Sequence, residues 1–215
     1  MILEDNGPWT DLIPALRRQG YIGRFEAALQ LHEFLLAADP LHPVVYGNGA
    51  LLFMAADRAE EAIPLLQRLL ILSPDYPNAH YHLARALLLT DRSAEALIHA
   101  DKEADPAYRL TALAMGQHST GQSEESISSI EQLAALHGDR SPYQVATAMA
   151  WTGNVDGAFE WLERAQQSGD YMLGDAHIDP ILDGLHADPR WVPLLENMGV
   201  SQAQLERITF EYVPR

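Results

Sequence analysis

The sequence predicts an all-α protein, built as an α-solenoid of about five helix pairs with a helical cap at its C-terminal end. One observation is a period, because small residues recur every 34 residues, at Ala28, Ala62 and Ala96. A second is that turn-forming residues repeat with the same step, at Gly23, Asp57 and Asp91. Two antiparallel helices need a small residue where they cross and a turn-former between them. The period therefore indicates stacked helix pairs.

The period divides the chain into five units and a tail. Pro40 and Pro74, which are also 34 residues apart, close the first two units, and Pro106 comes two residues early at the end of the third. In the less regular second half, Gly121 and Gly153 mark the turns between helices. The expected units cover residues 9–41, 42–76, 77–106, 107–138 and 139–170, and residues 171–215 form the tail.

The second unit carries the clearest pattern of residue types. Its first helix has large, small, small and aromatic residues at Tyr46, Gly49, Ala50 and Phe53, and its second helix has Ala62, Leu66 and Leu69. Pro64 is expected near the first turn of that second helix, where a missing N–H costs little. This unit resembles the tetratricopeptide repeat. The resemblance implies a right-handed superhelix that binds a protein or peptide and catalyses no reaction.

A second resemblance concerns residues 107–200. Their order of residues, including Asp156, Phe159, Trp161, Pro180 and Trp191, is similar to the closing repeats of bacterial tetratricopeptide proteins linked to transcription regulators, cyclases or kinases. No such effector domain is present in this sequence. Two alternatives are open at this point: the chain is a free-standing scaffold, or it is a fragment of a longer protein.

Composition excludes several classes of function. The formal net charge is -16 and Lys102 is the only lysine, which disfavours nucleic acid and acidic membrane surfaces as partners. There is no cysteine, hence no disulfide and no thiolate metal site. The sequence contains neither an apolar leader nor a stretch long enough to span a membrane. We expect a cytoplasmic protein, although the lack of cysteine does not distinguish cytoplasm from periplasm.

The tail has the makeup of a cap for the open end of a solenoid. Aspartate before proline favours a helix start, so Asp179 and Asp188 are each expected to begin a short helix, and Ser201 a last one. Apolar residues such as Leu182 and Trp191 would cover unit five, and Trp161 is expected to pack against this tail. Residues 208–213 alternate apolar and polar types as a strand would.

The concave face of the solenoid is the expected binding site, because the first helix of each unit lines it. The positions that point into this groove in the family predict thirteen partner-binding residues in this chain. They are Arg17, Tyr21, Leu51, Met54, Asn78, Tyr81, Arg85, Tyr108, Met115, His118, Tyr143, Thr147 and Trp151. Without lysine, the set favours an apolar or aromatic peptide segment with at most one acid group. Arg17 and Arg85 would receive that acid, or else pair with neighbouring acids of this chain.

Other chemistry finds little support. His80 and His82 lie two apart and would point in different directions on a helix, with His80 in the packing and His82 facing out. His177, between Asp175 and Asp179, is the one further candidate for weak metal binding, and an incidental placement is favoured over it. We expect no catalytic residue, no metal and no cofactor. The leading hypothesis is a non-enzymatic protein-binding scaffold. One alternative is a self-association module, which would make the protein a homo-oligomer, and another is a regulatory region of a signalling protein.

Overall fold

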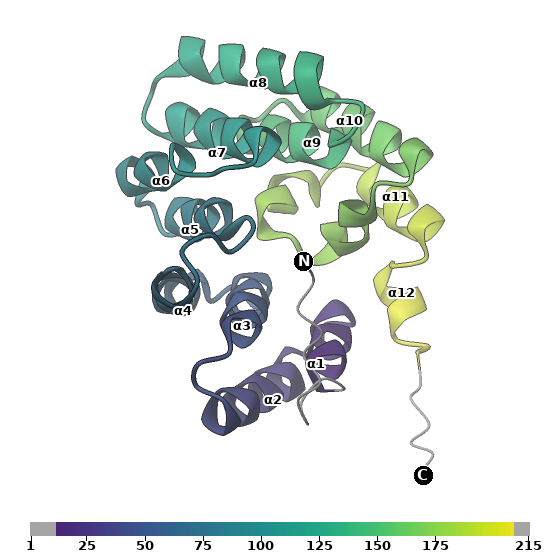
Figure 1. Cartoon of the computed structure of the whole chain (residues 1–215). Helices are drawn as coiled ribbons and strands as arrows, with labels where there is room; N and C mark the ends of the chain where they lie inside the picture. The colour runs from purple at the N-terminus through teal and green to yellow at the C-terminus, as the bar shows by residue number, and fades with distance from the viewer. Residues whose placement is uncertain (1–11, 209–215) are drawn as a thin grey trace.

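The computed structural model describes residues 12–208, which form helices and no strand within that range. Ten α-helices of the described residues lie in five consecutive antiparallel pairs (Figure 1). Their bounds are α1 (Leu12–Tyr21), α2 (Phe25–Ala38), α3 (Pro43–Ala55), α4 (Ala59–Leu72), α5 (Ala79–Leu88), α6 (Ser93–Ala100), α7 (Pro106–Ser119), α8 (Ser123–His137), α9 (Pro142–Trp151) and α10 (Val155–Ser168). The predicted helical solenoid is thus confirmed.

The turn inside each helix pair has the same backbone conformation. One residue between the two helices adopts a positive φ in every unit. The angle is 75° at Gly23, 58° at Asp57, 58° at Asp91, 80° at Gly121 and 79° at Gly153. Glycine reaches this left-handed region without steric cost, and aspartate is among the few other residues that visit it. The recurrence of glycine and aspartate at these positions therefore has a physical cause, which is the sharp reversal between the two helices.

The small residues of the period lie where the two helices of a pair cross. Ala28, Ala62 and Ala96 are 0% exposed, and at the equivalent places in the fourth and fifth pairs Ser126 is 2% exposed and Ala158 is 0% exposed. The Ser126 hydroxyl donates a hydrogen bond to the Ala114 carbonyl at 2.8 Å, so its polar atom is satisfied inside the pair. A larger side chain at any of these positions would force the two helices apart, because protein interiors are close-packed.

The tail does not only cover the end of the array. It continues as two 3-10 helices, η1 (Tyr171–Ile178) and η2 (Pro180–Leu185), and then as α11 (Trp191–Met198) and α12 (Gln202–Leu205). Leu173, Leu182, Leu185 and Trp191 share one buried core with Phe159 and Leu162 of α10, as a cap would. Figure 1 shows the yellow-green segments η1 and η2 inside the arc of α1 to α9, on its concave side.

Two of the three helix starts predicted for the tail are present, at Asp179 and Ser201. Asp179 caps η2 by accepting a hydrogen bond from the Ile181 N–H at 3.0 Å, with Pro180 as the first helical residue. The start predicted at Asp188 and Pro189 is wrong: Asp188 accepts from the Arg190 N–H at 2.9 Å in a turn, and α11 begins only at Trp191. Ser201 and Gln204 form a capping box at α12. Of the strand expected at 208–213, only Ile208 lies within the described residues.

Two local predictions need correction. Pro64 is the sixth residue of α4, in the second turn, so its missing N–H does remove a helical hydrogen bond, and its exposed ring faces solvent. Trp161 is only half-buried, and its ring reaches back to Gly138, between α8 and α9, besides flanking the core that the tail shares. The Arg164 guanidinium lies over the same ring, 4.3 Å from its centroid.

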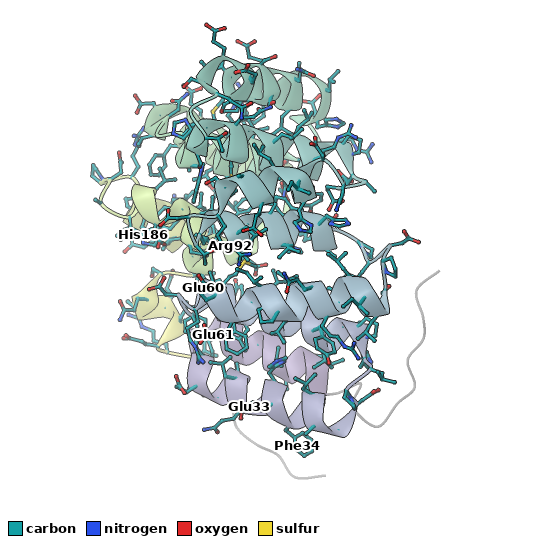
Figure 2. All side chains as sticks on the ribbon, turned by 90° about the vertical axis from the view of Figure 1, so that its left-hand side faces the viewer. Glu33, Phe34, Glu60, Glu61, Arg92 and His186 are labelled. Carbon is teal, nitrogen blue, oxygen red and sulfur yellow. The ribbon has the colours of Figure 1, made fainter. Side chains whose placement is uncertain are left out.

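The outer surface is acidic and solvated. Glu33 of α2 and Glu60 and Glu61 of α4 are exposed and project outward in the side view of Figure 2. Arg58 and Arg92 make short-range ion pairs with Glu61 and Glu95 at the turns. Within residues 12–208, no helix combines the length and apolar character that crossing a lipid bilayer requires.

Candidate functional site: a hollow on the concave face

The concave face holds a cavity of about 690 Å³, which we call the hollow. Its walls come mainly from α1, α3 and α5, with one residue each from α7 and α9, on one side, and from η1 and the start of η2 on the other. The volume falls in the range of roughly 300–1,000 Å³ that is usual for ligand pockets. The hollow occupies the part of the concave face nearest the N-terminal repeats, and the tail fills the part nearest the C-terminal repeats.

Eight of the thirteen predicted groove residues line the hollow. They are Arg17, Tyr21, Leu51, Met54, Asn78, Arg85, Tyr108 and Tyr143. Their accessibility differs widely. Leu51 is 39% exposed and Arg17 is exposed, whereas Met54 and Tyr143 are almost fully buried. A ligand in the hollow would therefore meet Leu51 and Arg17 more readily than Met54 or Tyr143.

The other five predicted residues lie elsewhere. Tyr81, Met115 and Thr147 are at most 1% exposed, and Tyr81 and Met115 pack in one core with Ile181 of the tail. His118 is exposed outside the hollow. The Trp151 indole N–H donates a hydrogen bond to the Ser119 hydroxyl at 2.8 Å, which ties α9 to α7.

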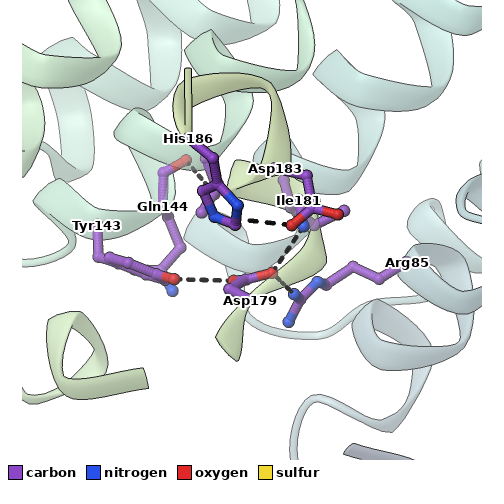
Figure 3. Close-up of polar contacts among 8 residues, drawn as sticks. Arg85, Tyr143, Gln144, Asp179, Ile181, Asp183 and His186 are labelled. Atoms are coloured by element: carbon purple, nitrogen blue, oxygen red, sulfur yellow. Dashed lines mark hydrogen bonds and ion pairs between the residues drawn. The ribbon is translucent and has the colours of Figure 1, made fainter. Parts of the chain in front are cut away.

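Asp179 fixes the tail to the array, and we call its contacts the anchor. Its carboxylate forms a buried ion pair with Arg85 of α5 and accepts a hydrogen bond from the Tyr143 hydroxyl of α9 at 2.8 Å (Figure 3). Asp179 is 7% exposed and Arg85 is 6% exposed. Of the two alternatives for Arg85, pairing with an acid of this chain is therefore the correct one, although that acid is 94 residues away in sequence.

Electrostatics at the anchor favours the charged ion pair. Burial opposes the charge of Arg85, but the carboxylate of Asp179 more than offsets this and raises the pKa of Arg85. Burial, followed by the same carboxylate, raises the pKa of Tyr143 well above its ordinary value, so its hydroxyl stays a donor. A paired charge of this kind is tolerated in a protein interior, whereas either partner alone would be costly.

His82 differs from the prediction that it would face outward. It lines the hollow, and its Nδ1 is enclosed without a hydrogen-bond partner among the described residues. Burial, and then the nearby Arg85, lower the pKa of His82 to about 3. His82 is therefore neutral at ordinary pH, and the charges that line the hollow are those of three arginines and two aspartates, at Arg17, Arg18, Arg85, Asp175 and Asp179.

The tail side of the hollow was not foreseen from the sequence. Tyr171, Met172, Asp175 and Ile178 form this wall, and Tyr171 is 80% exposed. No local pattern marks these residues as groove-facing, because the tail lies outside the repeat. The Asp-Pro sequence at Asp179 indicated a helix start. The spacing of residues in the sequence did not indicate that Asp179 pairs with Arg85 of α5.

The histidines do not gather into a metal site. The residues 12–208 contain no group of three or more potential metal ligands. His80 packs in a helix contact as expected, with its Nδ1 3.0 Å from Nδ1 of His99. Burial comes first among the causes that lower the pKa of His99 to about 4. Both nitrogens of His177 face backbone carbonyl oxygens, so neither is directed at a shared ion with Asp175 and Asp179.

Comparison with known proteins agrees with this architecture. Residues 53–113 match the family described as tetratricopeptide repeat. The crystal structure of YrrB, a TPR protein with an unusual peptide-binding site, is similar over 77% of this chain and 89% of YrrB, with 17% identity and a TM-score of 0.51. The structure of PilW, a type IV pilus biogenesis factor, is similar over 94% of this chain and 98% of PilW, with 17% identity and a TM-score of 0.58. No curated protein matches by sequence.

The chain carries tetratricopeptide repeat sequence at residues 53–113, within an array of five helix pairs. The matched region runs from the end of α3 into α7 and includes the units with the most regular period. The two similar structures share the fold with this chain, and at 17% identity the likeness extends to the fold alone. The resemblance of residues 107–200 to regulator-linked arrays stays a prediction.

Proposed function

We propose that this protein is a non-enzymatic scaffold that binds a short segment of a partner protein in the hollow. The observation that carries the proposal is the cavity of about 690 Å³ on the concave face, walled by the array and by the tail. Tetratricopeptide arrays serve as protein-interaction modules, and YrrB is a TPR protein with an unusual peptide-binding site. This supports a peptide as the class of ligand.

The position of the tail limits the length of the segment. Ile181 is 3% exposed and packs with Tyr81 and Met115, so the C-terminal half of the concave face is already filled. A partner segment would therefore end in the hollow or turn back out of it, and would not run the length of the groove. This distinguishes the proposed binding from binding along an open solenoid.

The lining supports an apolar or aromatic segment with one acid group. Leu51 and Tyr171 offer exposed apolar surface, the kind of side chain that contributes most at interfaces when it becomes buried. Arg17 and Arg18 are exposed at the same cavity, and neither has an ion pair within the described part of the chain. A guanidinium can hold a carboxylate with two hydrogen bonds. A single acid on the partner would therefore be matched there.

The test is a comparison of two double variants of the full chain. Leu51→Ser with Tyr171→Ser removes exposed apolar surface from the hollow, and Ile71→Ser with Ile98→Ser removes it from the outer face. Each protein would be used to select binders from a random peptide library and to measure their affinity. We expect the hollow variant to bind selected peptides at least tenfold more weakly, because a contact at the centre of an interface contributes about 1–2 kcal/mol or more.

The outer-face variant should keep the affinity of the unmodified protein. Peptides selected by the unmodified protein should be rich in aromatic and aliphatic residues and carry one acidic group. Equal affinity in the two variants would refute the hollow as the binding site. Selected peptides that are basic would refute the assignment of Arg17 and Arg18.

Three further expectations concern self-association, location and the class of partner. The self-association alternative was based on the resemblance to regulator-linked arrays and on an apolar end at Ile208, Phe210, Tyr212 and Val213, of which only Ile208 lies among the described residues. A cytoplasmic location stays a prediction. A protein or peptide partner, rather than nucleic acid or membrane, is supported by the net charge of -16.

A further inference from the structure

The tail touches the first repeat as well as the last. Nε2 of His177 lies 2.7 Å from the carbonyl oxygen of Tyr21, which is the last residue of α1. The imidazole ring also meets the Tyr21 ring edge to face, with centroids 4.8 Å apart. We call this contact the clasp. Together with the anchor at Asp179, it makes η1 a strap from the C-terminal repeats across to the first repeat.

The second nitrogen of His177 also faces a carbonyl oxygen. Nδ1 lies 3.1 Å from the carbonyl of Gly174. A carbonyl oxygen only accepts hydrogen bonds, whereas a neutral imidazole has a single N–H to donate. A neutral His177 can therefore satisfy one of the two contacts, and only the protonated ring can donate to both at once.

The position of His177 at the C-terminal end of α1 also favours a protonated imidazole. The last carbonyls of a helix lack helical partners, and the helix dipole places partial negative charge there, so a cation near this end is favourable. From these two observations we infer that the clasp is a protonation-dependent closure of the array: protonated His177 holds α1 against the tail, and neutral His177 holds it less firmly.

The neighbouring charges are compatible with a cation at this position. Asp175 and Asp179 lie on the tail, and Arg17 of α1 and Arg85 of α5 interact electrostatically with Asp175, as His177 does. Arg85 is already neutralised by its ion pair with Asp179. Tyr21 contributes its ring, and burial, followed by Asp175, raises the pKa of its hydroxyl, which therefore remains uncharged.

Release of the clasp would change access to the hollow. Pro14, Arg17 and Arg18 of α1 form part of its wall, whereas only Leu16 and Gly20 of α1 are buried. A helix with few buried side chains opens at a lower free energy than one that is packed on several sides. Movement of α1 away from the tail would widen the hollow, and the clasp is independent of what the hollow binds.

The experiment measures the opening directly in the full chain. The protein contains no cysteine, so spin labels attach only at introduced ones, Ala27→Cys on α2 and Gly184→Cys on η2. Ala27 is exposed, and a Cβ at Gly184 meets no atom within 4 Å. Distance distributions would be recorded at about pH 5 and about pH 8, the window in which a histidine changes charge. We expect a narrow distribution at the lower pH and a larger population of longer distances at the higher.

His177→Ala should show the longer distances at both values, with the open population raised severalfold and up to about tenfold, which corresponds to about 1.4 kcal/mol. His177→Gln, whose amide can still donate to Tyr21, should lie between the two and not respond to pH. His186→Ala is the matched control, because it removes another tail histidine, which contacts Trp191 and Asp183 and not Tyr21. An unmodified protein that does not respond to pH, or a His177→Ala variant that keeps the response, would overturn the inference.

Discussion

The two halves of the concave face are built from equivalent repeat positions but reach opposite states. In the C-terminal half, Tyr81 and Met115 are at most 1% exposed, because they pack in one core with Ile181 of η2. In the N-terminal half, Arg17 and Leu51 remain exposed around the hollow. A groove position in such an array is thus available for binding only where the chain does not cover it itself.

This difference assigns distinct roles to the two halves. Residues under the tail are expected to contribute to stability, and the proposed function expects residues around the hollow to contribute to binding. Replacing the same type of side chain should therefore change the free energy of unfolding by very different amounts in the two halves.

The largest contrast is between two arginines. Arg85→Ala would leave the buried carboxylate of Asp179 without its partner, which typically costs about 3–5 kcal/mol. Arg17→Ala removes an exposed side chain and should change the free energy of unfolding by no more than about 0.5 kcal/mol. Unfolding in urea measures both.

A double variant separates charge from packing at the anchor. Arg85→Met combined with Asp179→Leu removes both charges and keeps apolar volume, and such replacements are often neutral or stabilising. We expect it to recover most of the loss seen in Arg85→Ala. A double variant as unstable as the single one would mean that the ion pair is not the cause.

A second contrast compares two leucines. Leu182 of η2 is 0% exposed, and Leu182→Ala should cost about 2–5 kcal/mol through lost burial and the cavity left behind. Leu51 is 39% exposed, so Leu51→Ala should cost less than about 1 kcal/mol while weakening ligand binding. Similar losses of stability for the two would show that the tail does not belong to the packed core.

The pH dependence of stability tests the burial of His82 at the boundary between the halves. Its pKa is about 3 in the folded protein and 6.5 in the unfolded chain, so the unfolded state binds the proton more readily. Its contribution is complete above about pH 6.5 and is lost as the pH falls toward 3, up to about 3 kcal/mol by pH 4. Urea unfolding at pH 7 and pH 4 should show a smaller difference for His82→Gln than for the unmodified protein. An equal difference would show that His82 is not enclosed.

The smallest effect is expected at Trp161. Because this ring is half-buried and partly covered by Arg164, Trp161→Ala should cost about 1–2 kcal/mol, less than the roughly 3–5 kcal/mol of a fully buried aromatic site. Thermal unfolding of the variant measures it. A loss as large as that of Leu182→Ala would mean that Trp161 belongs to the core shared with the tail.

The sequence predicted what depends on local periodicity. Three turn residues of positive φ and the small residues of the first three helix crossings were visible as a 34-residue period, and Gly121 and Gly153 marked the later turns, because each helix pair meets the same steric demands. The placement of the tail was not predictable in this way. The contacts of Asp179 with Arg85 and of His177 with Tyr21 join residues that are 94 and 156 positions apart. Each contact occurs once, so the repeat pattern does not predict it.

In the candidate site, too, the residues of the repeats were predictable and the contribution of the tail was not. The repeat register identified the side of each helix that faces the groove, and eight of the thirteen predicted residues line the hollow. The sequence could not show that Tyr81 and Met115 lie beneath Ile181, or that Tyr171 and Asp175 form the opposite wall. Those facts depend on how far the tail folds back, which is decided by packing over the whole array.

Amide hydrogen exchange of the tail in the full chain tests the central claim most directly. If η2 fills the C-terminal half of the concave face, its amides from Ile181 to Leu185 should exchange as slowly as those of α5 and α9, which open only with the whole array. The exposed start of η1 at Tyr171 should exchange faster. Fast exchange throughout residues 179–185, with α5 and α9 protected, would contradict the account and leave the whole groove open to a partner.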